Sequence, residues 1–229
     1  MSIIKLRESR VKPMVFMVTA AFLLLVAAYF LPFDIAGKLC FPVSLLCLAS
    51  LFLTPWEISL ALLFSALGDL AGVCGCFLAQ MGSFAIAHIF YIVFFVRRYI
   101  RKVEPDRKLT AKATGYMLLM GICVAALLLL VLVTIVPQAP QGVVRVGAGV
   151  YAGVICLMLF WALLQRSSLY ALGALLFVVS DFALAWRMFV CDYSYADIVI
   201  LGTYFAAQWL LFVRATSYKV PHPIHLLRF

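Results

Sequence analysis

The sequence predicts an all-α integral membrane protein, a bundle of eight transmembrane helices that together form a single domain over residues 1–229. Composition is the first observation behind this prediction. Hydrophobic residues make up 67% of the 229 positions and charged residues 12%, and the mean hydropathy is +1.14. These values exclude an ordinary soluble domain. Length is the second observation, because such a chain holds eight spans of about 20 residues and little else.

The apolar runs give the expected spans in order: residues 14–32, 38–54, 57–74, 79–97, 113–136, 143–164, 168–188 and 195–213. The first run is long for a signal peptide and leads into Pro32 rather than into a cleavage site of small residues. The third and fourth runs are the least clearly separated, since only Gly75–Leu78 lies between them. The tail after the eighth run, with His222 and His225 between prolines, is expected to be disordered.

The distribution of positive charge is the third observation. If the N-terminus is cytoplasmic, an eight-span topology puts all but three of the 18 Lys and Arg residues on the inner side, the exceptions being Lys38, Arg145 and Arg187. This asymmetry is the positive-inside pattern, and losing one span would scramble it. We therefore expect both termini in the cytoplasm, with a bacterial inner membrane as the location. The net charge of +9 then reflects topology, and no nucleic acid partner is expected.

The longest connection, residues 97–112, is strongly basic. We expect it to anchor the topology and to contact the anionic headgroups of membrane lipids. The seven cysteines lie mostly in apolar segments and are interpreted as small apolar side chains. A metal or redox site at Cys74, Cys76 and Cys191 is an alternative that the spacing does not require. The sequence leaves the oligomeric state open.

Two acidic residues lie well inside apolar spans, Asp69 in the third and Asp181 in the seventh. A carboxyl group at membrane depth costs about 2.5–3.5 kcal/mol even on the insertion scale, so such residues are usually functional. At 1.5 Å per residue, Asp69 lies about 18 Å and Asp181 about 21 Å from the inner ends of their spans. By the same count, three further polar residues fall near that level: His88, Tyr151 and Tyr204. We expect these groups to converge on one layer in the outer half of the bilayer.

Helical periodicity supports this convergence. Ser65 shares a helix side with Asp69, as His88 does with Tyr91 and Tyr204 does with Gln208, because residues three or four apart are neighbours on a helix. The glycines of Gly68-x-x-x-Gly72 and Gly147-x-Gly149 allow close helix approach beside these positions.

The chemistry remains open on these residues alone. Two of the three histidines lie in the tail, so a zinc site with three histidine ligands is excluded, and we expect no metal. Two carboxyl groups in apolar surroundings tend to differ in protonation, one neutral and one charged. Such a pair suits acid/base hydrolysis through an oxocarbenium-like state. It also suits a proton-coupled lipid or small-molecule transporter, although the short loops weigh mildly against that alternative.

The order of motifs resembles the YhhN-like lysoplasmalogenase family of eight-span membrane proteins. The matching pieces are Lys38, Phe64-Ser65-x-x-Gly68-Asp69, the segment 82–91 with Ala87-His88, the segment 173–189 with Ser180-Asp181, and Tyr204-Phe205-Ala206-Ala207-Gln208. Departures are modest: Phe205 replaces an expected Tyr, and Cys40 interrupts the usual Lys-Pro start.

The resemblance implies an enzyme that hydrolyses the vinyl-ether bond of a lysophospholipid substrate, a lysoplasmalogen, without a cofactor. The products are a fatty aldehyde and a glycerophospho-ethanolamine or -choline. On this hypothesis Asp69 and Asp181 are the catalytic acid and base. The supporting and substrate-binding residues are Lys38, Ser65, His88, Tyr91, Tyr151, Ser180, Tyr204 and Gln208, with Lys38 near the lipid phosphate at the outer mouth.

Overall fold

The computed structural model describes residues 3–32, 35–102 and 111–217, with the side chains of residues 3–10 and 102 left out. In the described ranges the regular elements are all helical. The helices are α1 (Ile3–Phe30), η1 (Lys38–Cys40), α2 (Phe41–Leu53), α3 (Trp56–Val73), α4 (Phe77–Lys102), α5 (Ala111–Thr134), η2 (Val136–Gln138), α6 (Val143–Leu163), α7 (Ser168–Phe189) and α8 (Ala196–Thr216). The predicted all-α class is therefore confirmed.

Seven of these helices are long and apolar enough to cross a membrane. The expected span at 38–54 is shorter than the other seven, because η1 and α2 together cover only Lys38–Leu53. At 1.5 Å per residue this is about 24 Å, short of the ~30 Å hydrocarbon core. The third and fourth spans are separate helices, as predicted. The chain reverses between them at Gly75, whose φ of 71° lies in the left-handed region that favours glycine.

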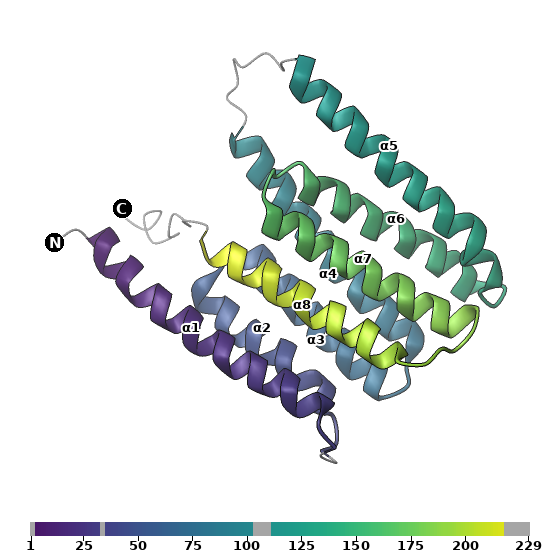
Figure 1. Ribbon diagram of the computed structural model, residues 1–229, viewed down its shortest axis with the longest axis horizontal. Helices are drawn as coiled ribbons and strands as arrows, with labels where there is room; N and C mark the ends of the chain where they lie inside the picture. Colours follow the sequence, from purple (N-terminus) through teal and green to yellow (C-terminus); the bar gives the residue numbers. More distant parts are fainter. Residues whose placement is uncertain (1–2, 33–34, 103–110, 218–229) are drawn as a thin grey trace, which may run out of the picture.

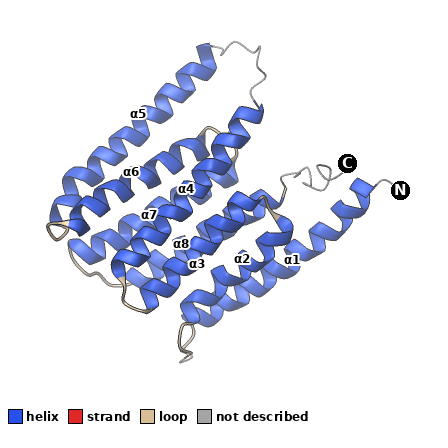
Figure 2. Ribbon diagram, turned by 180° about the vertical axis from the view of Figure 1, so that it is seen from behind, coloured by secondary structure: helices blue, strands red, loops and turns tan. Residues whose placement is uncertain are grey.

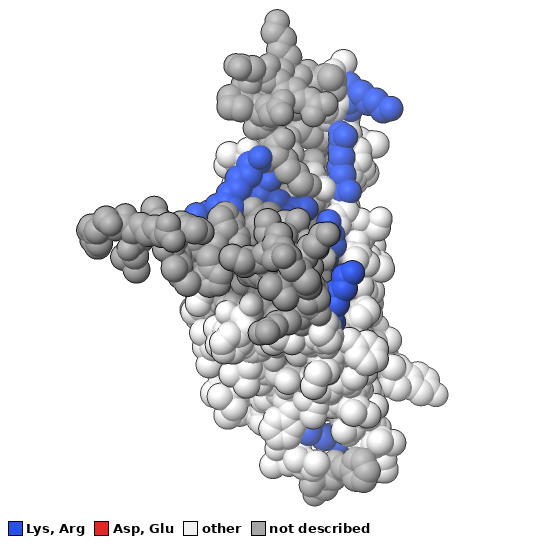
Figure 3. All heavy atoms as spheres, turned by 90° about the vertical axis from the view of Figure 1, so that its left-hand side faces the viewer, with Lys and Arg blue, Asp and Glu red and all other residues white. Residues whose placement is uncertain are grey.

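The helices form one bundle in which chain neighbours run antiparallel, so that the start of α1 and the end of α8 lie at the same end (Figures 1 and 2). The Arg98 and Arg214 guanidiniums both lie over the Tyr170 ring at this end, and Figure 3 shows other Lys and Arg side chains gathered there. This agrees with the predicted charge asymmetry, while the cytoplasmic orientation stays a prediction. The centre of the basic loop, the basic residues up to Arg10 and the histidines of the tail lie outside the described side chains.

Close helix contacts surround the level of the two acidic residues. A Cβ added at Gly68 would lie 3.0 Å from the Phe84 ring, and one at Gly72 would lie 2.7 Å from Gln80 Nε2. These glycines therefore let α4 pack tightly along α3, as the sequence predicted. Gly147 is similarly tight against Met81, whereas Gly149 has only ordinary contacts.

Helices α7 and α8 also pack closely, at Gly173, and this contact gives a stability prediction. A Cβ at Gly173 would lie 3.0 Å from two side-chain carbons of Leu211. We expect Gly173→Ala to lower the free energy of unfolding by about 1–3 kcal/mol through overpacking. The matched control is Gly153→Ala on α6, where nothing lies within 4 Å of the added Cβ and where alanine's helix propensity favours the folded state. Thermal unfolding in detergent measures both, and equal midpoints for the two variants would contradict the prediction.

Candidate functional site

Asp181 forms a cluster with two other polar side chains, and the three residues come from three different helices. The Tyr151 hydroxyl on α6 donates a hydrogen bond of 2.5 Å to Asp181 Oδ2 on α7. His88 Nε2 on α4 lies 3.1 Å from the Tyr151 oxygen and 3.4 Å from Asp181 Oδ2. The His88 side chain is fully buried and the Asp181 side chain is 14% exposed. The carboxyl group therefore has two partners that hold it in place, while one side remains accessible.

The second acidic residue has a different partner. Asp69 on α3 is 2% exposed and accepts a 3.0 Å hydrogen bond from the Tyr204 hydroxyl on α8. The Tyr204 ring packs edge-on against Phe84 at 5.7 Å and against Phe177 at 5.6 Å. A hydrogen bond of this kind offsets part of the cost of burying a carboxyl group.

The ring of Phe177 on α7 packs against one partner of each carboxyl group. It contacts His88 at a centroid distance of 4.8 Å and Tyr204 at 5.6 Å. The structure thus brings the five predicted residues into two adjacent groups, and among the described residues no hydrogen bond joins Asp69 to Asp181. Another predicted pair lies one turn along α4 from His88, where the Tyr91 hydroxyl donates a 2.8 Å hydrogen bond to Gln208 Oε1.

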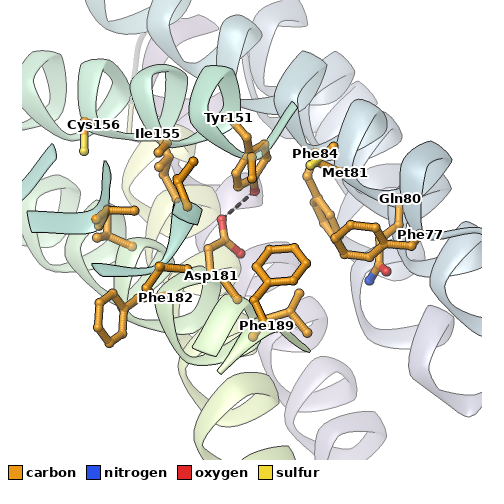
Figure 4. Close-up of a pocket in the computed structure, with 18 residues that line it drawn as sticks. Phe77, Gln80, Met81, Phe84, Tyr151, Ile155, Cys156, Asp181, Phe182 and Phe189 are labelled. Carbon is orange, nitrogen blue, oxygen red and sulfur yellow. Dashed lines mark hydrogen bonds between the residues drawn. The ribbon is translucent and has the colours of Figure 1, made fainter. Parts of the chain in front are cut away.

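A cavity that is partly open to the outside lies beside Asp181. Its walls come from α4, the end of α5, η2, α6 and α7, and they are mostly apolar (Figure 4). The side chains of Asp181 and Tyr151 meet in its lining, joined by their hydrogen bond, and Gln80 is a further polar group in the lining. Asp69 does not line this cavity. An apolar pocket with a few convergent polar groups is the usual form of a small-molecule site.

Three predicted supporting residues lie elsewhere. Ser65 donates its hydrogen bond to the Ala61 carbonyl of its own helix, and Ser180 donates to the Ile200 carbonyl of α8. Both are helix-backbone contacts rather than parts of the cavity lining. Lys38 Nζ bonds the Leu31 carbonyl at 3.2 Å and lies over the Tyr29 ring. The structure therefore does not bring Lys38 to the cavity that contains Asp181.

Several cavity residues were not predicted from the sequence. Gln80, Phe84 and His88 follow one another at intervals of four residues on α4, so they share one face of the helix. This spacing from His88 could have predicted from the sequence that Gln80 belongs to the site. Phe177, which contacts His88 and Tyr204 without lining the cavity, could not be singled out, because an aromatic ring in an apolar span normally indicates only core packing.

The donor set indicates proton transfer. A carboxyl group beside an imidazole and a phenol can hold a proton, deliver it to a bound molecule and take one up from water. Within the described ranges, no group of three or more His, Cys, Asp or Glu residues is arranged to hold a metal ion.

A sequence profile of the YhhN family matches residues 35–215. The curated protein "Lysoplasmalogenase TMEM86B" from Homo sapiens is 33% identical over 162 residues, covering 70% of this chain. Its counterpart from Mus musculus is 30% identical over 178 residues, covering 77% of this chain. The aligned part spans 64% of the length of the human relative and 71% of the mouse relative. No solved structure matches the chain significantly.

Proposed function

The chain belongs to the YhhN family, and from this we propose that it is an intramembrane hydrolase that cleaves the vinyl-ether bond of lysoplasmalogens. The products are a fatty aldehyde and a glycerophospho-ethanolamine or -choline. The names of the human and mouse relatives support this substrate class. We further propose that the protein resides in a bacterial inner membrane with both termini in the cytoplasm and with its basic loop against anionic lipids.

One observation carries the proposal: the apolar cavity at whose wall Asp181 lies, held by Tyr151 and backed by His88. A single-chain lipid is largely hydrocarbon, so an apolar cavity suits it. The reacting bond of a vinyl ether has only one polar atom, and the cavity provides proton-transfer groups in a small polar region. This match between ligand and lining supports an ether-lipid substrate over a polar one.

The proposed reaction begins with protonation. The neutral member of the Asp69/Asp181 pair gives its proton to the vinyl carbon that is not bonded to oxygen, and the oxygen-bearing carbon becomes part of an oxocarbenium ion. The ionised member stabilises this cation and then accepts a proton from the attacking water. The hemiacetal formed breaks its bond to the glycerol oxygen, which takes up a proton, and the aldehyde leaves. His88, Tyr151, Tyr91 and Tyr204 orient the water and the carboxyl groups.

The position of Phe84 determines how Asp69 can take part in the proposed reaction. The Phe84 ring lines the cavity on one side and packs against Tyr204, the partner of Asp69, at 5.7 Å. Asp69 therefore takes part from just behind the cavity wall, and the proton that it gives or accepts passes by way of the Tyr204 hydroxyl. Asp181, which lines the cavity, is the carboxyl group that contacts the reacting atoms.

The direct test is to supply lysoplasmenyl-ethanolamine to the purified protein and to measure aldehyde release. We expect release above the rate of empty detergent micelles or liposomes. A proton-coupled transporter would instead move lipid across proteoliposomes without forming product. Transport without aldehyde would therefore replace the hydrolase proposal by the alternative.

A further inference from the structure

The cavity beside Asp181 extends in two directions along the bundle. Towards one end it reaches Phe77, Gln80 and Phe189, and towards the other it reaches Ile155 and Cys156, with Asp181 between the two parts (Figure 4). Gln80 is a polar group in the first part. The second part presents aliphatic and sulfur-containing side chains, as expected of a surface that contacts hydrocarbon.

A second, open groove lies between α5, α6 and α7 towards the end of the bundle where α1 begins and α8 ends. Its lining is apolar except for the Ser168 hydroxyl and the Cys123 thiol, and it consists of Cys123, Val124, Leu127, Leu159, Leu163, Ser168, Ala171, Leu172 and Leu175. The groove opens to the surface of the bundle that faces lipid, where Leu172 and Leu175 are each 47% exposed.

The two linings continue one another on all three helices. On α7 the groove ends at Leu175 and the cavity resumes at Val178; on α6 it ends at Leu159 and the cavity resumes at Cys156. On α5 the step from Leu127 to Val131 is again one turn. Residues three or four apart share a helix face, so the groove and the inner part of the cavity form one apolar stripe. We call this stripe, from Asp181 to Ser168, the chain trough.

The length of the trough matches one lipid chain. Asp181 and Ser168 are thirteen residues apart on α7, which corresponds to about 20 Å. At about 1.2 Å per bond of an extended chain, a hexadecenyl chain is about 18 Å long. A membrane lipid chain with its ether end at Asp181 therefore fits within the trough.

We propose that the chain trough binds the single hydrocarbon chain of the ether lipid, with the ether end at Asp181 and the methyl end near Ser168. This inference rests on the proposed function, and it adds that trough residues set chain-length selectivity. The polar part of the lipid then lies on the other side of Asp181, in the part of the cavity that contains Gln80.

Large side chains placed at two depths in the trough test the proposal. Leu175 is six residues from Asp181 and Ala171 is ten, or about 9 Å and 15 Å along the helix. We expect Leu175→Trp to reduce hydrolysis of 1-hexadecenyl lysolipid about tenfold or more relative to 1-octenyl lysolipid. Because Ala171 lies farther from Asp181, we expect Ala171→Phe to leave the hydrolysis of both the octenyl and the dodecenyl lysolipid unchanged and to reduce only that of the hexadecenyl lysolipid. The matched control is Leu157→Trp on α6, which is also 47% exposed but lies outside both linings.

The outcomes separate the two proposals. A hexadecenyl-to-octenyl ratio unchanged in both trough variants, or lowered equally in the control, overturns the trough. Absence of aldehyde from every chain length in the unmodified protein overturns the proposed function instead.

A binding measurement on the unmodified protein tests the trough even if the variants fold poorly, and it does not depend on hydrolysis. A saturated 1-hexadecyl lysolipid with a diazirine at its methyl end is photo-crosslinked to the unmodified protein in liposomes. We expect labelled peptides from α5 and α7 near Cys123 and Ser168, with competition by unlabelled 1-hexadecyl lysolipid. Labelling spread over all lipid-facing helices without competition overturns the trough.

Discussion

Replacing Asp181 with asparagine is expected to lower aldehyde release by about a thousandfold, the range seen when a positioned acid or base is removed. Asparagine has nearly the same shape and still accepts the hydrogen bond that Tyr151 donates to Oδ2. It carries neither a transferable proton nor a charge. The expected loss is therefore chemical, and turnover of lysoplasmenyl-ethanolamine by purified protein in liposomes measures it.

The matched control for this variant is Asp197→Asn. Asp197 lies at the start of α8, where its exposed carboxylate pairs with Arg187, and exposed ion pairs contribute little to stability. Its variant should keep turnover close to that of the unmodified protein. Asp181→Asn should also elute as a folded protein with an unchanged unfolding midpoint. Near-normal turnover by Asp181→Asn would remove this residue from the mechanism.

Replacing Asp69 with asparagine is expected to lower turnover by about a hundredfold. The Asp69 carboxyl is buried and bonded to Tyr204, and an asparagine amide oxygen can accept the same hydrogen bond. A loss in Asp69→Asn therefore reports the charge or proton of Asp69 rather than the anchoring of Tyr204. Turnover is measured beside that of Tyr204→Phe, which keeps the carboxyl group and removes the anchor.

The comparison of these two variants separates two roles. If Asp69→Asn stays active while Tyr204→Phe loses activity, Asp69 serves only to position Tyr204 and the paired-carboxyl mechanism is wrong. If Asp69→Asn is the more damaged of the two, the carboxyl group itself takes part in the chemistry.

The helical architecture could be predicted because apolar runs and positive charges both respond to the membrane. The helix ends were less predictable. The span expected at 79–97 is part of α4, which continues to Lys102, and the span expected at 14–32 belongs to α1, which begins at Ile3. Hydropathy indicates where the hydrocarbon begins, whereas a helix ends where its backbone hydrogen bonds end, and basic residues continue a helix into the headgroup region.

The site was predictable in its level but not in its pairings. Counting residues placed His88, Tyr151 and Asp181 near one depth, and they do bond to one another. Counting gives no rotation of one helix relative to its neighbours. Hence the division of Asp69 and Asp181 between two hydrogen-bonded groups, and the position of Lys38 over Tyr29, could not be read from the sequence.

Helix α5 lies at the edge of the bundle beside α6 (Figure 1), and Val124 is its one fully buried residue among 24. Bilayer hydrocarbon can replace most of its contacts at little cost, because lipid tails are as apolar as the side chains they would touch. A lysolipid can therefore reach the chain trough, between α5, α6 and α7, directly from the bilayer and without passing through water. The concentration that governs turnover is then the lipid's mole fraction in the bilayer, and diluting the substrate with inert phospholipid at constant bulk concentration should slow the reaction in proportion.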